Sequence, residues 1–435
     1  MKQLLLLSAA ALTTLSSLGQ ETTKFITTID SINVYNIMLE NAPQRPNIKD
    51  VPRFTLVGKD SKFYLGMGAN VKMVGDFDWG SPLSNPNIFA PKDIPMRSEP
   101  GNRSQTLFSV GQSNIYWNFV ALPGSKNQVG LFFDIIFLGK SSTPVIQIHH
   151  LYMKYRGFTA GYVVSTFTDL KAEPYSIDFG GPNAMTLVRH PNIYYTAKFG
   201  KDKMWTAQLG LDMPDMASFT TGDGTSEVNQ RMPDIPFFIQ RSWAENKGWL
   251  RFSAIFRDLQ YKNLKSYTVE EGPKVDLKGA FGWGIKLSGR TPIAGGLSAS
   301  WEAVYGKGIS SYIQDLSGEH LDLVPYSEAY KKGKLDAVKV WGAYGSLQYD
   351  FCKCGFINFT YSQVRSYADN YGSSAGASAA WSSLYKYGQY VTSNLIFNVS
   401  SFAQVGVEYL WGRRVNYSGE QAHDNRLMLM LNLSI

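Results

Sequence analysis

The feature that most constrains this chain is an alternation of apolar and polar side chains that begins near residue 61 and recurs to the end. In the first such segment, Phe63, Met67 and Val71 share one face, while Asn70 and Lys72 share the other. A period of two is typical of β-strands, because consecutive side chains point to opposite faces of a sheet. A soluble sandwich also alternates, with its apolar face buried against a second sheet. Repetition over many segments of roughly ten residues, with short and long connections in turn, instead favours a β-barrel in a lipid bilayer.

We predict sixteen antiparallel strands, and hence an all-β transmembrane β-barrel with both termini on the periplasmic side. The strands lie near residues 62–78, 104–121, 128–139, 144–156, 158–166, 187–199, 204–214, 236–243, 249–260, 278–290, 296–308, 338–350, 356–367, 386–399, 402–416 and 424–435. Hydrocarbon offers no hydrogen-bond partner to the backbone, so the strands must close on themselves. Short turns are expected on the periplasmic side of such a barrel, and long loops outside.

Composition supports a membrane barrel and argues against other classes. Charged residues make up 18% of the 435, below the quarter usual in soluble domains, whereas aromatic residues reach 14%. That mixture suits a wall with aromatic girdles at both membrane interfaces. We assign to these girdles Trp79, Trp117, Trp249, Trp341 and Trp411. The net charge of +7 comes from scattered Lys and Arg without long basic runs, so we expect no nucleic-acid partner.

The N-terminus has the three parts of a secretory signal peptide. Lys2 supplies the positive charge, residues 4–18 supply the apolar core, and Ser17, Leu18 and Gly19 supply the small-residue cleavage pattern. We predict a signal peptide over residues 1–19, a periplasmic N-terminal extension over 20–60 with a short helix near 32–40, and the barrel over 61–435. No later window approaches a continuous apolar run of about eighteen residues, so we expect no transmembrane helix.

One long connection differs from the others in composition. Residues 165–187 follow a short apolar strand and are rich in Asp, Glu, Gly and Pro. Loops of this length in compact chains are usually functional, and we expect this third long loop to fold into the barrel and narrow the hole. Its acids Asp169, Glu173 and Asp178 either offset the charge of the wall or, as we favour, pair with wall arginines and hold the loop. Arg189 follows where the next strand begins.

Three groups of residues form longer motifs. The first comprises Ser165-Thr166-Phe167-x-Asp169, Pro174, Ile177-Asp178-Phe179-x-Gly181-Pro182 and Arg189. The second comprises Gly282-Trp283-Gly284-x-x-Leu287-Ser288-Gly289 and Tyr305-Gly306-x-Gly308-Ile309-x-x-Tyr312. The third comprises Gly406-Val407-Glu408-Tyr409-x-x-Gly412-x-Arg414 and Asn425-Arg426. Together they resemble the DcaP-like outer-membrane porins over residues 61–435, and the first resembles that family's third-loop motif.

The resemblance implies a homotrimeric porin of the Gram-negative outer membrane that passes small, often carboxylated solutes. The family tends to carry arginines in its second and sixth strands. This chain has Gln112, Asn114 and Tyr194 there instead, which implies a weaker preference for anions. Such barrels usually end in an aromatic residue, and this chain ends in Ile435.

Alternation also assigns a set of charged and polar residues to the lumen face of the predicted barrel. These predicted pore-lining residues are Lys72, Asp134, His149, Arg251, Arg257, Lys286, Glu302, Glu408, Arg414 and Arg426. A barrel of this strand number encloses water, and basic groups outnumber acidic ones in the set. We therefore expect a mild preference for anions, exerted by the field of the wall.

The sequence gives little support to catalysis or to a bound cofactor. His149 and His150 are adjacent in a predicted strand, so we expect them to point to opposite faces and not to act together. We predict no catalytic residues, no metal site and no cofactor. Cys352 and Cys354 occupy a predicted turn, where they are either two free thiols or one strained bridge.

We conclude from the sequence that the chain is an outer-membrane porin for passive diffusion of small hydrophilic solutes, with outer-membrane lipids around it. The main alternative is a structural or adhesive outer-membrane barrel with a blocked lumen. An energised receptor would need a folded plug much larger than residues 20–60. A soluble two-sheet carbohydrate-binding protein is a further alternative, which would be soluble without detergent.

Overall fold

The computed structural model describes residues 24–25, 31–43, 54–58, 61–96, 101–140, 143–221, 225–265, 274–325, 334–371 and 378–435. The predicted signal peptide lies outside these residues, so it stays a prediction. Neither α-helix in the described part of the chain is long and apolar enough to cross a membrane.

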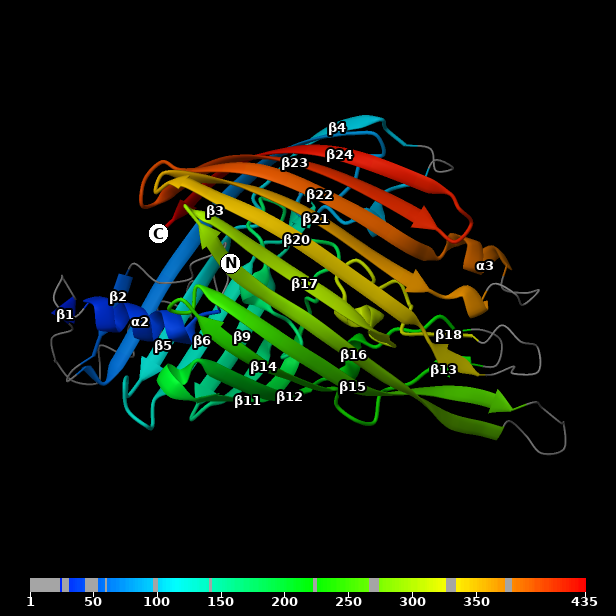
Figure 1. Ribbon diagram of the computed structural model, residues 1–435, viewed down its shortest axis with the longest axis horizontal. Coiled ribbons are helices and arrows are strands. Elements are labelled where there is room, and N and C mark those ends of the chain that lie inside the picture. The colour runs from blue at the N-terminus through cyan, green and yellow to red at the C-terminus, as the bar shows by residue number, and fades with distance from the viewer. Residues whose placement is uncertain are drawn as a thin grey trace.

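Sixteen long antiparallel strands form a closed barrel (Figure 1). They are β3 (Phe63–Trp79), β5 (Asn114–Ala121), β6 (Val129–Ile136), β9 (Gln147–Tyr155), β10 (Phe158–Val164), β11 (Arg189–Phe199), β12 (Trp205–Asp212), β14 (Ile235–Trp243), β15 (Gly248–Lys265), β16 (Lys274–Ala294), β17 (Leu297–Lys307), β20 (Lys339–Cys352), β21 (Gly355–Tyr367), β22 (Tyr385–Asn398), β23 (Ala403–Asn416) and β24 (Gln421–Ser434). Each pairs with its neighbour along the chain, and β24 returns to β3 with Asn425 opposite Trp79 and Ser434 opposite Asn70. The predicted sixteen-stranded barrel is confirmed.

The remaining elements are short. The strands are β1 (Lys24–Phe25), β2 (Phe54–Val57), β4 (Ser104–Ser109), β7 (Gly139–Lys140), β8 (Thr143–Pro144), β13 (Thr225–Glu227), β18 (Leu323–Pro325) and β19 (Leu335–Ala337). The helices are α2 (Ser31–Asn41) and α3 (Ser378–Ser383), with 3₁₀ turns η2 (Pro91–Asp93), η3 (Leu170–Ala172), η4 (Lys201–Lys203), η5 (Pro214–Met216), η6 (Ser310–Tyr312) and η8 (Asp369–Tyr371).

Two strand boundaries differ from those predicted. The predicted strand 104–121 is broken into β4 and β5, which pair with opposite ends of β3. Between them, Ser113 Oγ accepts the backbone N–H of Lys72 at 3.0 Å, in place of a ladder bond. Conversely, β15 and β16 extend beyond their predicted ends and stay paired out to Lys265 and Lys274.

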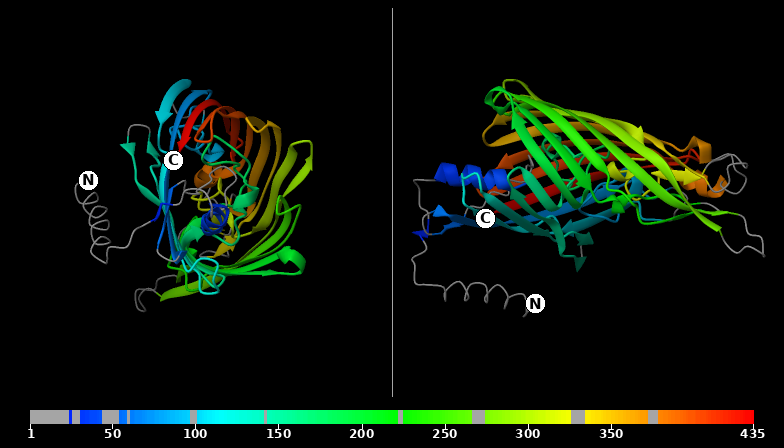
Figure 2. Two further views of the ribbon diagram at one scale, coloured as in Figure 1. Left: turned by 90° about the vertical axis from the view of Figure 1, so that its left-hand side faces the viewer. Right: turned by 90° about the horizontal axis from the view of Figure 1, so that it is seen from below.

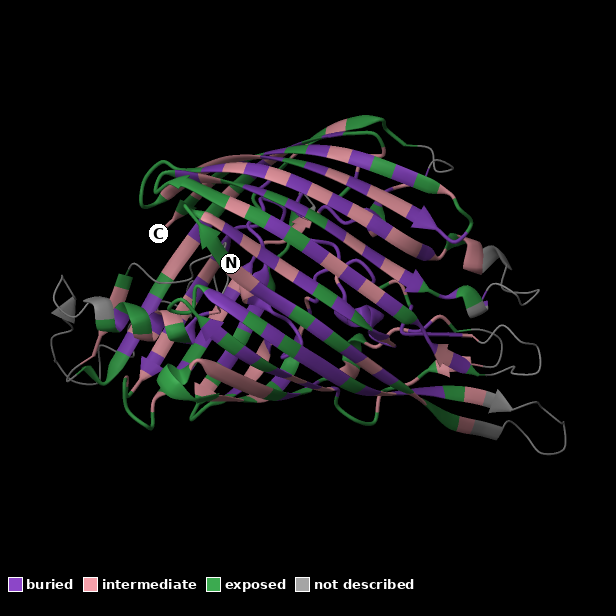
Figure 3. Ribbon diagram, viewed as in Figure 1, coloured by how far each residue is buried: buried purple, intermediate pink, exposed green. Residues whose placement is uncertain are grey.

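Burial alternates along each strand as predicted for a barrel wall (Figure 3). In β3, Met73 and Phe77 are about half exposed, whereas Asp76 and Asp78 between and beyond them are buried. The assignment of Trp249 to an aromatic girdle was wrong, since its side chain is 5% exposed and points inward. The period of two required this, because Trp249 lies two residues before the inward-facing Arg251.

The N-terminal elements that the structure describes and the C-terminus lie at the short-turn end of the barrel (Figure 1). Strand β2 pairs with β3 from Phe54 opposite Met67 to Val57 opposite Tyr64, beyond the last residue that β24 covers. It thereby continues the wall past the C-terminus. Helix α2, which matches the helix predicted near residues 32–40, lies within the ring of strands when the barrel is viewed from this end (Figure 2). In the turn between β20 and β21, Cys352 and Cys354 form a disulfide.

Candidate functional site in the barrel lumen

The third long loop (residues 165–188) leaves β10 and returns to β11, but it binds strands on the other side of the barrel. Glu408 on β23 accepts hydrogen bonds from Ser176 Oγ at 2.8 Å and from the backbone N–H groups of Ile177 and Asp178 at 2.9 Å. One wall carboxylate thus holds three consecutive loop residues across the lumen.

The first half of this loop is held at Asp169. Its Oδ2 accepts hydrogen bonds from Ser288 Oγ at 2.6 Å and from Trp249 Nε1 at 3.0 Å, and its Oδ1 lies 3.3 Å from Arg251 Nη2. Burial acts to raise the pKa of Asp169, but the positive charges of Arg251 and Lys286 outweigh burial and lower it. Asp169 is therefore ionised, and its ion pair with Arg251 fixes the loop to β15.

The second half of the loop is bound by three further wall side chains. The backbone N–H of Thr186 donates to Glu302 Oε1 at 2.7 Å, and Lys286 Nζ donates to Thr186 Oγ1 at 2.8 Å. Lys286 and Glu302 also face each other at 3.3 Å. The backbone N–H of Ala184 donates to Ser362 Oγ on β21 at 3.0 Å. The contacts of this loop therefore extend from β15 to β23.

Asp178 joins the third loop to the first long loop (residues 80–103). Its Oδ1 accepts the backbone N–H of Phe89 at 2.9 Å, and its Oδ2 accepts the hydroxyl of Tyr390 at 3.1 Å. Burial and the nearby charge of Glu408 raise the pKa of Asp178 to about 7. The loop acids thus differ, because Asp169 has a cationic neighbour in contact and Asp178 does not.

Two predicted wall arginines hold the first long loop. Arg426 donates from Nε and Nη2 to the two carboxylate oxygens of Asp78 at 2.7 and 2.9 Å, and from Nη1 to the carbonyl oxygen of Asn85 at 2.9 Å. Arg414 donates from Nη1 to the carbonyl oxygen of Lys92. The first loop therefore also folds into the barrel, which the sequence pattern did not predict.

Arg257 binds the fourth and sixth long loops. Its Nε donates to Asp234 Oδ2 at 3.0 Å, and its Nη1 donates to the carbonyl oxygen of Gly308 at 2.7 Å and lies 3.1 Å from Asp322 Oδ2. Asp234 ends the fourth long loop, which joins β12 to β14, and the other two residues belong to the sixth long loop (residues 308–338). All three side chains that carry charge here are buried.

The third and sixth loops also pair through their backbones. The N–H of Gln314 donates to the carbonyl oxygen of Met185 at 3.0 Å, and the N–H of Leu187 donates to that of Tyr312 at 3.2 Å. Apolar side chains of both loops, with Phe167 and Ile313 among them, share one buried cluster. The sequence held a signal for this, since the sixth loop carries apolar residues that a solvated loop would not need.

Asp315 connects three loops and the wall. Its Oδ1 accepts the backbone N–H of Lys92 in the first loop at 3.1 Å, and its Oδ2 accepts Asn183 Nδ2 in the third loop at 3.2 Å and the hydroxyl of Tyr385 on β22. Burial raises the pKa of Asp315 to about 6, although its hydrogen bonds oppose this rise.

The expectation that His149 and His150 point to opposite faces was wrong. The register between β6 and β9 shifts at Asp134, where a bulge places one extra residue in β9. Both rings therefore reach Asp134, with His149 Nδ1 at 2.8 Å from Oδ2 and His150 Nδ1 at 2.9 Å from Oδ1. Arg189 Nε lies 3.4 Å from His150 Nε2 and can only donate. The His150 proton is thus on Nδ1 and faces Asp134, so we assign the cluster to a hydrogen-bond network.

Eight of the ten predicted wall residues form a hydrogen bond with a long loop. They are Lys72, Arg251, Arg257, Lys286, Glu302, Glu408, Arg414 and Arg426. Asp134 and His149 bind each other. Glu173 is buried within the third loop, with 5% of its surface exposed. That these residues line a path for solutes stays a prediction.

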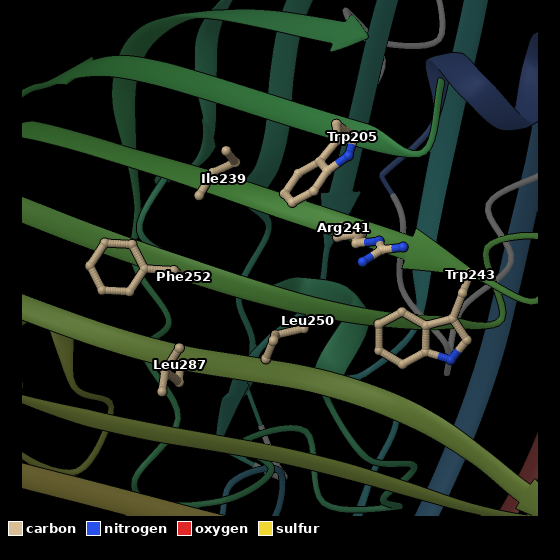
Figure 4. A pocket seen from close by; sticks show the side chains of 7 residues that line it. All are labelled: Trp205, Ile239, Arg241, Trp243, Leu250, Phe252 and Leu287. Atoms are coloured by element: carbon tan, nitrogen blue, oxygen red, sulfur yellow. The ribbon is translucent and has the colours of Figure 1, made fainter. Parts of the chain in front are cut away.

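The outer wall carries a groove of about 640 Å³ near the short-turn end (Figure 4). It is lined by Trp205, Ile239, Arg241, Trp243, Leu250, Phe252 and Leu287. The guanidinium carbon of Arg241 lies 5.8 Å from the centre of the Trp205 ring. Tryptophan and arginine at a strand end are typical of the level at which a barrel meets the membrane–water interface.

No family model and no curated protein sequence matches the chain. Among solved structures, the outer membrane channel DcaP of Acinetobacter baumannii superposes with a TM-score of 0.69 at 19% identity, over 87% of this chain and 100% of that chain. Outer-membrane expressed OmpT of Vibrio cholerae superposes with a TM-score of 0.50 at 11% identity, over 87% and 100%. The similarity to DcaP confirms, at the level of the fold, the family resemblance inferred from the three motifs.

Proposed function

We propose that this protein is a porin of the Gram-negative outer membrane, through which small hydrophilic solutes diffuse passively. The observation that carries the proposal is the closed barrel with apolar side chains outside and charged side chains inside. A wall of that kind suits a bilayer around it and a polar lumen within it. The long loops then lie outside the cell and the short turns face the periplasm.

The third long loop sets the bore in this proposal. It reaches from β10 to Glu408 on β23. Along the way, its residue Asp169 accepts hydrogen bonds from Trp249 on β15 and Ser288 on β16. A segment tied to the far wall at several points reduces the open cross-section of the lumen. The solutes are therefore expected to be small, with carboxylated molecules as the class that the DcaP-like motifs imply.

A mild preference for anions follows from how the wall cations are paired. Arg251, Arg257 and Arg426 each contact a carboxylate, which offsets their charge. Arg414 instead donates to neutral oxygens, namely the carbonyls of Lys92 and Ile94 and the side chain of Asn416. The predicted pore-lining set has more basic than acidic residues, but only part of this excess positive charge is thus expected to act on a passing ion.

The assembly proposed is a homotrimer surrounded by outer-membrane lipids. The rows of exposed apolar side chains on the outer wall, such as Leu209, Leu211 and Phe281, suit either lipid or a neighbouring subunit. The trimer is what the DcaP-like motifs imply, and chemical crosslinking of the detergent-extracted protein tests it.

A barrel with a blocked lumen is the second candidate, and one observation favours it. The first, third and sixth long loops share buried apolar clusters inside the barrel, since Phe89 and Ile177 belong to one cluster and Phe167 and Tyr312 to another. If these loops never separate, the barrel passes no solute and its role is structural or adhesive.

Planar-bilayer recording distinguishes the two candidates. The porin predicts stepwise conductance increments, and liposomes that contain the protein should swell in sugars and dicarboxylates up to a size limit. A blocked barrel predicts neither. Deletion of residues 172–184 in the third loop should raise the porin's conductance, and a sealed wild type that conducts only after this deletion would support the second candidate.

A further inference from the structure

Helix α2 (Ser31–Asn41) is docked against the inner wall at the short-turn end of the barrel. Its buried contacts are with β3, β5, β6 and β9, and Figure 2 shows it inside the ring of strands. Val34 and Met38 are the buried side chains at its centre, and they pack against Tyr64 and Val120. The helix thus occupies part of the mouth that the proposed function assigns to the periplasm.

The wall is shaped for the last residue of this helix. Asn41 Nδ2 donates to Asn118 Oδ1 at 2.6 Å, and also lies within hydrogen-bond distance of the carbonyl oxygens of Phe119 and Leu131. A side chain at Gly130 would collide with it, because a Cβ there would lie 1.9 Å from Asn41 Oδ1. Glycine at this position of β6 therefore makes room for the helix.

The wall also satisfies the carbonyl groups at the end of α2. A helix leaves its last carbonyls without internal partners. Here Tyr152 hydroxyl donates to the carbonyl of Asn41 at 2.7 Å, and Asn118 Nδ2 adds a second donor, at 2.8 Å, to the carbonyl of Met38, which also accepts the backbone N–H of Ala42. Lys154 Nζ donates to the carbonyls of Glu40 and Asn41 at 2.8 and 3.0 Å, where a cation also complements the helix dipole. Side chains of two strands, β5 and β9, thus donate to one helix end.

The docked contact is confined to one end and one face of the helix. Tyr35 is 46% exposed, and the ion pair between Glu40 and Lys198 is exposed on both sides. An exposed pair of this kind adds little to affinity. A helix held by a local polar site and two apolar side chains can leave without disturbing the ladder of the barrel.

We propose that α2 is a removable stopper of the periplasmic mouth, which narrows the porin when docked and widens it when released. The proposal rests on the proposed porin function. The docking site is the surface of Asn118, Gly130, Tyr152 and Lys154, and its ligand is the helix end that carries Asn41. Release of the helix changes the bore from the periplasmic side, independently of the long loops at the other end.

The test uses Gly130→Val in the full-length protein, which places a β-branched side chain where Asn41 lies. The matched control is Gly345→Val on β20, where a Cβ would meet nothing within 4 Å. Docking is read by reaction of Val34→Cys with a membrane-impermeant maleimide. Cys352 and Cys354 are paired and do not compete. Labelling should be several-fold faster with Gly130→Val than with the control.

Single-channel conductance of the same variants reads the stopper role. We expect a larger conductance with Gly130→Val, and with a second variant that lacks residues 31–42, than with wild type or Gly345→Val. Equal conductance in all four overturns the stopper even if labelling shows that the helix has left. Unchanged labelling together with unchanged conductance in the deletion variant overturns it as well. If no variant conducts, the porin function itself fails, while labelling still reports whether α2 is docked.

Discussion

Glu408 on β23 binds Asp178 of the third long loop across the lumen, and the backbone N–H of Asp178 donates to Glu408 Oε1 at 2.9 Å. The same carboxylate holds Ser176 and Ile177. The sequence predicted Glu408 as a charged residue that lines the pore. In the structure its carboxylate instead binds the loop that crosses the pore. The dimensions of the lumen therefore depend on a few wall side chains that bind loops.

Glu408→Ala should release the middle of the third loop and raise conductance. The substitution removes the acceptor of four buried hydrogen bonds, three from the loop and one from Asn394 on β22, and each buried donor left without a partner costs about 1–3 kcal/mol. The loop is expected to leave the wall, so that these donors reach water. Single-channel recording measures the change in bore, and limited proteolysis within residues 165–188 measures loop release.

Gln348→Ala is the matched control for this substitution. Gln348 lies on β20 and donates to Asp350, away from the long loops. It should leave both conductance and proteolysis unchanged. An unaltered proteolysis pattern in Glu408→Ala would show that the other anchors of the loop suffice without Glu408.

Arg414→Gln should lower the permeability ratio of anions to cations. Arg414 donates to neutral oxygens, and no carboxylate among the described residues contacts it and offsets its charge. Reversal potentials across a salt gradient measure the ratio. Arg413→Gln is the control, since the neighbouring Arg413 points to the outer face and binds Gln421 and Gln389. Equal shifts in both variants would contradict a lumen role for Arg414.

Arg257→Gln should destabilise the barrel. Removal of one partner of a buried ion pair leaves uncompensated charge and typically costs about 3–5 kcal/mol. Here both Asp234 and Asp322 lose their cation. The temperature at which the folded band is lost in heated detergent gels reports the change. Arg231→Gln, which breaks the exposed pair with Asp258, should change it little. A similar drop in both variants would argue against burial as the cause.

The strands could be predicted because their pattern is local. Side chains two apart must share a face, and one face must suit lipid, so the period of two is visible in segments such as that from Phe63 to Trp79. The same rule placed Lys286 and Glu302 on one face. The same rule requires Trp249 to lie inside with Arg251, and the girdle assignment failed because it ignored that parity.

The parts that were missed depend on contacts between distant residues. The bulge that turns His149 toward Asp134 shifts the register of β9 by one residue. Alternation counted along the sequence does not reveal such a shift. The inward course of the first loop is set by Asp178 and Arg426, which lie far from it in the sequence. Gly130 appears in the sequence as an ordinary strand glycine. Only the docked helix explains why a larger side chain would not fit there.

Conductance should rise as the pH is raised from about 5 to about 8, because acid strengthens the docking of the loops. Burial raises the pKa of Asp315 from 3.8 to about 6 and that of Asp178 to about 7. Between its usual pKa and the raised value, the docked loop holds a proton that the released loop has lost. Docking of the loops therefore becomes weaker as the pH rises through this range. Above the raised pKa values both states have lost the proton, so docking no longer changes with pH.

Asp315→Asn tests the sixth-loop part of this effect. An amide cannot lose a proton in this range, so the variant should show a flatter dependence of conductance on pH than wild type. Recordings at several pH values with constant salt measure the slope. Asp336→Asn is the control, since Asp336 is partly exposed and pairs with Lys307. If conductance of wild type instead falls steadily between about pH 5 and about pH 8, the buried acids do not govern loop docking, because burial that raises their pKa requires the opposite sign.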